Sequence, residues 1–237
     1  MTDISRRSLA AGAGLLVGAI TFGARAQQMA PQLASAVAVP KVTPKPLIFN
    51  PEKVKGLSAN LLRSHHDNEY AGVVKKLNAI GEELAKLDFA ETPAQKIGEL
   101  KRDEQIAYNS TLLHEIYFDG IAEAPSQPSG LLAQAMSRDF GSLDRWKAEF
   151  AGTGKSLASG TGWVILAYAP RDKRLFTFRA ENDSMSPAGG VPILAMDMYE
   201  HAYAADYGSD IAKYIDAYVQ AIKWTNAERL YREAMRV

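Results

Sequence analysis

The chain contains no cysteine, and this absence removes several kinds of chemistry at once. Its 237 residues can form no disulfide, offer no thiolate to a metal and supply no thiol nucleophile. Histidine is also scarce, with four residues in the whole chain. Imidazole is the commonest metal ligand and the side chain that titrates near neutral pH. The positions of these four side chains are therefore informative about function.

The chain also lacks an excess of charge of either sign. Lys plus Arg and Asp plus Glu each number 27, so the formal net charge is zero, and no run of basic residues occurs. We therefore expect no nucleic-acid partner. The hydrophobic share of 47% and the charged share of 23% are ordinary for a globular protein. The length suits one or two domains.

An apolar run near the N-terminus is too short to span a membrane comfortably. Leu9 to Phe22 contains 14 residues, whereas a spanning helix needs about 20. The run follows Ser5, Arg6 and Arg7 and precedes the A-x-A sequence at residues 24–26. This pattern predicts a twin-arginine export signal over residues 1–26, and a periplasmic or secreted protein with no stable membrane span after its removal. The alternative is an uncleaved membrane anchor.

The sequence predicts a tether followed by helices in the first half of the mature chain. Residues 27–46 contain four prolines and no sustained periodicity, which predicts a mostly extended or disordered tether. Apolar residues at helical spacing predict two helices, or one long broken helix, over residues 51–88, and another helix over residues 94–121. The stretch E-A-P-S-Q-P-S-G at residues 123–130 interrupts the pattern, and we take it as the boundary of an N-terminal helical domain at 47–124.

The second half, residues 130–237, mixes helical and strand patterns. Two short helices are expected within residues 131–158, with Ser142 as the N-cap of the second. A closing helical region is expected at residues 211–236. The expected strands, of which the first two form a hairpin, are residues 162–168, 174–178 and 191–196.

The end of the third expected strand carries a candidate metal site. Asp197 and His201 lie four residues apart where strand spacing gives way to helical spacing, so both side chains can point at one spot. The alternative is an ordinary helix start, with Asp197 as the N-cap and Glu200 as its capping-box partner. These residues alone leave both interpretations open.

Several motifs in the same order resemble those of the iron/manganese superoxide dismutases. The sequence D-M-Y-E-H-A-Y at residues 197–203 is similar to the family signature D-x-W-E-H-A-Y. The pair His65-His66, L-H-E-I-Y-F at residues 113–118 and G-T-G-W at residues 160–163 are also similar to family motifs. The resemblance extends from about Pro46 to Ala234. It implies an α+β fold, in which an N-terminal helical hairpin domain precedes a C-terminal α/β domain with a three-stranded antiparallel sheet.

The resemblance also implies a metal centre and a reaction. The four ligands would be His65, His114, Asp197 and His201, and they would hold one Mn or Fe ion per subunit. His66 would be a neighbour that does not bind the metal. Three imidazoles and a carboxylate suit a redox-active first-row ion. The implied reaction converts superoxide to dioxygen and hydrogen peroxide.

Around this centre the sequence departs from the family pattern. Glu69 stands where the family has a gateway histidine, Val73 where it has a tyrosine, and Tyr199 where it has a tryptophan. Asn182 and Ser110 stand at the two positions from which the family's solvent-binding glutamine comes. The choice between Mn and Fe stays open, with a lean toward manganese because the amide side chain is on the hairpin side.

These departures leave two functional hypotheses. The residues that would take part in catalysis are Glu69, Asn182, Tyr199, Glu200 and Tyr203. Glu69 would replace the missing acid/base group or, as an anion, repel superoxide. The alternative is a metal-binding protein of the same fold whose altered surroundings give weak or no turnover. The resemblance further implies a homodimer. In it, Glu200 would bond His201 of the partner subunit, and Tyr203 would approach Glu69 of the partner subunit.

Overall fold

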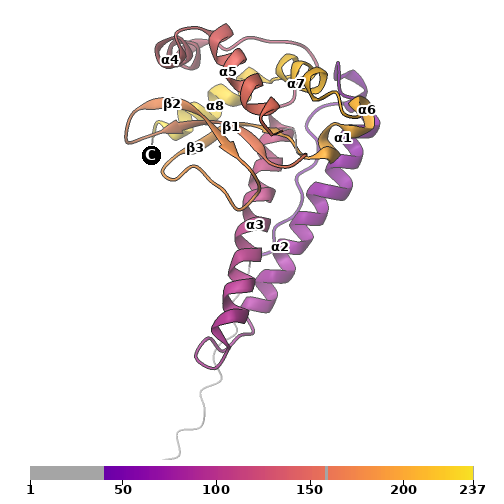
Figure 1. The fold of residues 1–237 in the computed structure, drawn as a ribbon, viewed down its shortest axis with the longest axis vertical. Helices are drawn as coiled ribbons and strands as arrows, with labels where there is room; N and C mark the ends of the chain where they lie inside the picture. The colour runs from indigo at the N-terminus through magenta and orange to yellow at the C-terminus, as the bar shows by residue number, and fades with distance from the viewer. Residues whose placement is uncertain (1–39, 158–159, 237) are drawn as a thin grey trace, which may run out of the picture. The chain divides into compact units, whose positions relative to one another are not determined.

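The computed structural model describes residues 40–157 and 160–236. The predicted export signal at residues 1–26, and the tether up to residue 39, lie outside the described residues. Figure 1 shows two long helices running side by side, with a small sheet and shorter helices at one end of the pair. The helices are α1 (Ala59–Ser64), α2 (Ala71–Leu84), α3 (Ala94–Asp119), α4 (Gly130–Phe140), α5 (Leu143–Lys155), α6 (Ala204–Tyr207), α7 (Ile211–Gln220) and α8 (Trp224–Ala234). The strands are β1 (Trp163–Ala169), β2 (Arg174–Ala180) and β3 (Val191–Asp197).

The first helical stretch is a single path interrupted by a change of winding. A π-helical segment, His65–Tyr70, joins α1 to α2 without a break in the chain. The prediction of two helices or one broken helix is thus resolved: the chain stays helical and widens at His65. Such π-helical turns are frequent at functional sites because the extra residue redirects side chains. Here the widened turn carries a buried histidine.

The last part of the predicted tether lies along this helical stretch. Residues 40–46 adopt neither helix nor strand. The Val42 backbone exchanges hydrogen bonds of 2.9 and 2.8 Å with the Asn78 amide in α2. The Lys45 amide donates to the Tyr70 hydroxyl at 3.0 Å. These bonds fix an extended conformation that propensity alone leaves open.

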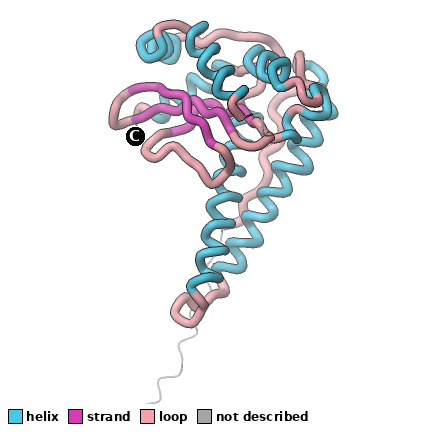
Figure 2. The backbone as a smooth tube through the Cα atoms, viewed as in Figure 1, coloured by secondary structure: helices cyan, strands magenta, loops and turns pink. Residues whose placement is uncertain are grey.

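The sheet is three-stranded and antiparallel, with the order β2-β1-β3 (Figure 2). Its central strand is buried from Trp163 to Tyr168, which means that helices or loops cover both of its faces. The β1–β3 register pairs Trp163 with Asp197, the last residue of β3. The register therefore sets a bulky indole beside the carboxylate that ends the strand. The fold agrees with the α+β class and the three-stranded antiparallel sheet expected from the resemblance.

The predicted domain boundary falls in the connection between α3 and α4. That connection is bonded to the loop between α7 and α8: Ala122 N donates to Ala221 O at 2.7 Å, and Lys223 N donates to Gly120 O at 2.7 Å. The α3 helix also packs on β3. The long helix and the sheet therefore share one interface, and the division at residues 124–130 stays a prediction.

Candidate metal centre

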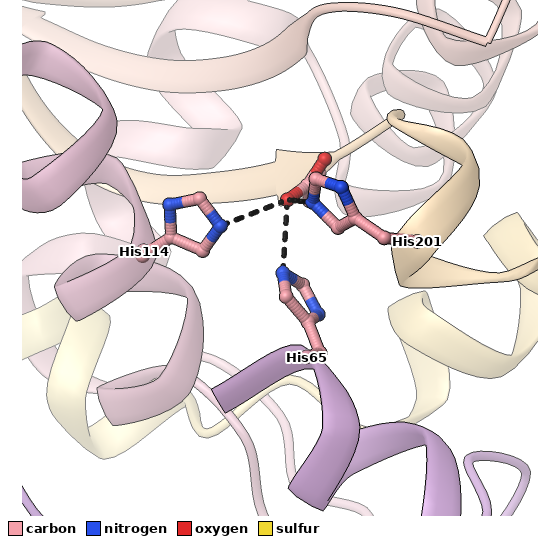
Figure 3. A group of neighbouring side chains, drawn as sticks. His65, His114 and His201 are labelled. Atoms are coloured by element: carbon pink, nitrogen blue, oxygen red, sulfur yellow. Dashed lines mark hydrogen bonds and ion pairs between the residues drawn. The ribbon is translucent and has the colours of Figure 1, made fainter. Parts of the chain in front are cut away.

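Four side chains converge in the interior between the helices and the end of the sheet. The Asp197 Oδ2 atom lies 3.1 Å from His65 Nε2, 3.1 Å from His201 Nε2 and 3.6 Å from His114 Nε2. The four donor atoms all lie within 4.8 Å of one another. Figure 3 shows the three imidazole rings arranged around one carboxylate, with His114 and His201 on either side of it. This is the group of residues predicted from the resemblance.

Four separate elements bring these ligands together. His65 comes from the π-helical turn, His114 from α3, Asp197 from the end of β3, and His201 from a short 3-10 turn at Glu200–Ala202. The end of β3 is held by Tyr214 in α7, whose hydroxyl donates to the Asp197 carbonyl at 2.6 Å. The site therefore depends on both the helical pair and the sheet.

Local hydrogen bonds orient the ligands. His114 Nδ1 donates to the carbonyl of Ser110, one turn earlier, at 2.7 Å, which turns Nε2 toward the centre. Asp197 Oδ1 accepts from the backbone N–H of Tyr199 at 2.8 Å, so Oδ2 faces the histidines. Asp197 thus binds the Tyr199 N–H with one oxygen and faces the site with the other. The predicted capping box with Glu200 does not form, because Tyr199 occupies the N-cap of the 3-10 turn and makes no side-chain capping bond.

The donor set fits a bound cation. His65, His114 and Asp197 are almost fully buried, and His114 Nε2 has no hydrogen-bond partner among the described residues. A buried polar atom without a partner costs about 1–3 kcal/mol, and coordination of a cation would satisfy it. Three imidazole nitrogens and one carboxylate oxygen suit Fe or Mn.

The charges in the site also favour metal binding at neutral pH. Burial lowers the pKa of His65, and it lowers the pKa of His114 to about 4, which keeps both rings neutral. Burial alone would raise the pKa of Asp197, but hydrogen bonds with His201 and His65 outweigh it and hold the pKa well below its usual range. Burial would lower the pKa of His201, yet the hydrogen bond to Asp197 and its charge raise it. The site therefore offers a carboxylate and the neutral nitrogens of His65 and His114 to a cation.

Aromatic rings surround the ligands. Tyr117 and Phe118 in α3 each lie 4.9 Å, between ring centroids, from His65. Trp163 meets His114 edge to face at 5.1 Å. Tyr199 stacks on His201 at 5.5 Å with an interplanar angle of 3°. Rings on three sides exclude water and leave the His201 side as the more exposed face, since its side chain is 26% accessible.

Two residues assigned to catalysis lie beside this open face. Glu69 Oε2 is 3.9 Å from His201 Nδ1, and its side chain is about half exposed (48%). Tyr199 is the ring stacked on His201. Val73, at the position of the family tyrosine, is partly buried and has no group that could carry a proton. Ser110, the other alternative for the glutamine position, lies with its Oγ 3.4 Å from His114 Nδ1.

The other assigned residues lie elsewhere. Asn182 is exposed, and its amide oxygen accepts from the backbone and hydroxyl of Ser184. Glu200 is exposed and packs across Gly160. Tyr203 is buried against Tyr214, with ring centroids 5.3 Å apart. The structure therefore does not bring Asn182 to the metal centre, and it leaves the roles of Glu200 and Tyr203 as predictions.

The sequence reasoning missed Asp183, the next residue after Asn182. Its Oδ1 accepts from the indole N–H of Trp163 at 3.0 Å, and its Oδ2 accepts from the hydroxyl of Tyr199 at 2.7 Å. Burial, followed by the charge of Asp183, raises the pKa of Tyr199. The signal that could have found Asp183 is the buried indole of Trp163, a donor that requires an acceptor.

Several known proteins are similar in sequence to this chain. Residues 128–230 match the family described as "Iron/manganese superoxide dismutases, C-terminal domain". The chain is 49% identical to a superoxide dismutase [Fe] of Cupriavidus metallidurans over 192 residues, which cover 81% of this chain and 97% of that protein. It is 30% identical to a superoxide dismutase [Fe] of Pyrobaculum aerophilum, covering 76% and 86% of the two chains. It is also 30% identical to a superoxide dismutase [Mn] 1 of Halobacterium salinarum, covering 75% and 88%.

The sequence similarity and the geometry of the site point to the same family. The match of 97% of a relative's length includes both the helical part and the sheet, and the four predicted ligands meet at one point. The chain belongs to the iron/manganese superoxide dismutase family, with His65, His114, Asp197 and His201 forming its one Fe or Mn site.

Proposed function

We propose that this chain converts superoxide to dioxygen and hydrogen peroxide at one bound Fe or Mn ion. The observation that carries the proposal is the cluster of three imidazoles and one carboxylate within 4.8 Å, in a chain 49% identical to a protein named superoxide dismutase [Fe]. When bound, the ion supplies one-electron redox chemistry by alternating between its trivalent and divalent states. The chain's own residues orient the ligands and keep water from all but one side.

The open side of the site decides how the anion and the protons arrive. Peroxide formation consumes protons, and Glu69 is the carboxylate beside His201 on that side. A carboxyl group there can supply a proton as a general acid. The same group, when ionised, repels superoxide. Two features therefore favour the second candidate, a metal-binding relative with weak or no turnover: the carboxylate of Glu69 on the open side, and the apolar Val73 at the position of the family tyrosine.

The identity of the metal is left to measurement. The lean toward manganese rested on the amide of Asn182, which lies against Ser184 in the structure. The relatives named above include proteins called [Fe] and one called [Mn]. Both ions accept the same nitrogen and oxygen donors.

The experiment is to purify the mature chain, measure its bound metal, and follow superoxide decay after reconstitution with each ion separately. Decay that depends on stoichiometric Fe or Mn supports the dismutase. Stoichiometric metal with decay no faster than that of the metal-free chain would establish the metal-binding candidate instead. A chain that takes up neither ion would contradict both candidates.

We further propose export to the periplasm and assembly as a homodimer. The export proposal rests on Arg6 and Arg7 before the short apolar run and on the A-x-A sequence at residues 24–26. Among the described residues, no helix is long and apolar enough to cross a membrane. Fractionation tests export: cells that express the full chain should yield the protein without residues 1–26 in the periplasm, and replacing Arg6 and Arg7 together by Lys should retain the protein in the cytoplasm.

A further inference from the structure

The carboxylate of Asp183 is held by two donors, one for each oxygen. Trp163 is completely buried, and its indole N–H can only donate. It donates to Oδ1 at 3.0 Å, and the Tyr199 hydroxyl donates to Oδ2 at 2.7 Å. Hydrogen bonds from two fixed aromatic side chains leave the carboxylate little freedom to turn.

The backbone around Asp183 is tied to the helix that carries His114. The Asn109 side-chain amide donates to the Asp183 carbonyl at 2.7 Å, and the Gln105 amide donates to the Ser184 carbonyl at 2.7 Å. Both amides belong to α3, upstream of His114. The loop between β2 and β3 thus moves with the helix that supplies a ligand.

Each ring bound to Asp183 packs on a different ligand. Trp163 meets the ring of His114, and Tyr199 stacks on His201. Both histidines point their Nε2 atoms toward the shared Asp197 carboxylate (Figure 3). One side chain is therefore bonded to both of the aromatic rings that pack on two of the three imidazoles.

The charge of Asp183 is not neutralised by a neighbour. None of the salt bridges among the described residues joins it to a Lys or Arg, and it is only partly exposed. By contrast, Glu181, two residues earlier, is exposed and paired with Arg179 at 2.7 Å. A negative charge near a metal favours the more highly charged state of that metal.

We infer that Asp183 is a positioning residue that holds His114 and His201 through Trp163 and Tyr199, and that its charge favours the trivalent state of the bound metal. The inference rests on the metal site of the proposed function and adds a residue to it. It predicts that the charge and the hydrogen bonds of Asp183 can be separated by substitution, because Asn has the shape of Asp without the charge.

The test compares Asp183→Asn with the wild type and with Glu181→Gln, a control that removes a carboxylate from the same loop. The readouts are metal content, the absorption spectrum of the bound metal, and the midpoint potential measured by redox titration. In Asp183→Asn we expect bound metal, a shifted spectrum, and a ratio of trivalent to divalent metal lowered about tenfold at a fixed potential. Glu181→Gln should match the wild type.

An unchanged potential in Asp183→Asn, or an equal shift in Glu181→Gln, would overturn the inference. If Asp183→Asn does not fold, Tyr199→Phe supplies the second test. It keeps the ring on His201 but removes the donor that partly neutralises Asp183, so the potential should move in the opposite direction, toward the trivalent state. No movement in that variant would also overturn the inference.

These outcomes are distinguishable from a failure of the proposed function. A wild type that binds metal without accelerating superoxide decay refutes the dismutase but leaves the comparison of potentials intact. A wild type that binds no Fe or Mn refutes both.

Discussion

His114 combines burial, an oriented ring and a free nitrogen, so its removal should affect the metal and little else nearby. Replacing His114 by Ala removes one of four ligands, and we expect metal affinity to fall at least about tenfold. Because a bound metal stabilises the folded state, chelation should lower the melting temperature of the wild type but not that of His114→Ala. Metal analysis and thermal unfolding with and without chelator measure this.

His66, which follows the ligand His65 in the sequence, provides the control. His66 is exposed to intermediate degree, bonded to the Lys45 carbonyl and to Asp67, and outside the ligand group. His66→Ala should keep its metal and lose about 1 kcal/mol of stability. Equal metal loss in both variants would contradict the assignment of His114 as a ligand.

Kinetic measurements can distinguish the two roles proposed for Glu69. If its carboxyl group exchanges protons with the site, Glu69→Gln should slow turnover or change its dependence on pH. If instead its charge repels superoxide, the variant should be faster at low ionic strength. Steady-state rates between pH 6 and 9 distinguish these two roles, with Glu83→Gln, in the adjoining helix α2, as the control. A profile identical to that of the wild type would make Glu69 a bystander.

Single residues also show where sequence reasoning ends. The ligands could be predicted because the motifs that carry them resemble those of a known family; the spacing of Asp197 and His201 alone left two interpretations open. Asn182 and Asp183 could not be told apart in the same way. They lie in the loop between β2 and β3, where the direction of each side chain depends on the bonds from Asn109 and Gln105 in a distant helix. Such tertiary bonds are not encoded in local periodicity.

At the scale of elements, the helices and strands follow local signals closely. Ser142 caps α5 as predicted, with its hydroxyl accepting from the Arg145 N–H at 3.1 Å. The predicted strands are observed, with ends displaced by one or two residues. The π-helical turn at His65–Tyr70 was not predicted as such, because no Gly or Pro marks it in the sequence.

The end of α4 illustrates how an element is joined to the sheet. Asp139 accepts hydrogen bonds from the Arg138 guanidinium and from the Leu175 N–H at the start of β2. Burial alone would raise the pKa of Asp139, but these bonds outweigh it and lower the pKa. A carboxyl whose pKa is lower when folded adds stability above its ordinary pKa. That stability is lost as pH falls through the lowered value.

Asp139→Asn should therefore be less stable than the wild type at pH 7, by about 1–3 kcal/mol. The difference should begin to shrink as pH falls below about 4, the ordinary pKa of Asp, and should be gone below the lowered pKa of the folded protein. Urea unfolding of both metal-free proteins at several pH values measures it. Asp172→Asn, an exposed partner of Arg171, should be nearly neutral throughout. A difference that persists unchanged at pH 3 would contradict the role given to the carboxylate.

At the scale of the whole molecule, the predicted homodimer involves Glu200, which the single chain leaves exposed, and Tyr203, which it buries. Glu200 makes no salt bridge among the described residues, and its neighbour His201 turns Nδ1 toward the open side. We expect the native mass of a dimer by light scattering, and a weaker dimer with less tightly bound metal in Glu200→Gln. Glu52→Gln, on the helical side, should behave as the wild type. A monomeric wild type would refute the prediction.

The separation of the ligands along the chain has a consequence for how the metal is acquired. Positions 65, 114, 197 and 201 meet only when the long helices and the sheet are packed, and three of the four side chains are then almost inaccessible to solvent. We therefore expect entry and exit of the ion to require partial opening of the fold, and exchange between folded chains and the medium to be slow. The ion found in the purified protein is then a record of which metal was available when the chain closed.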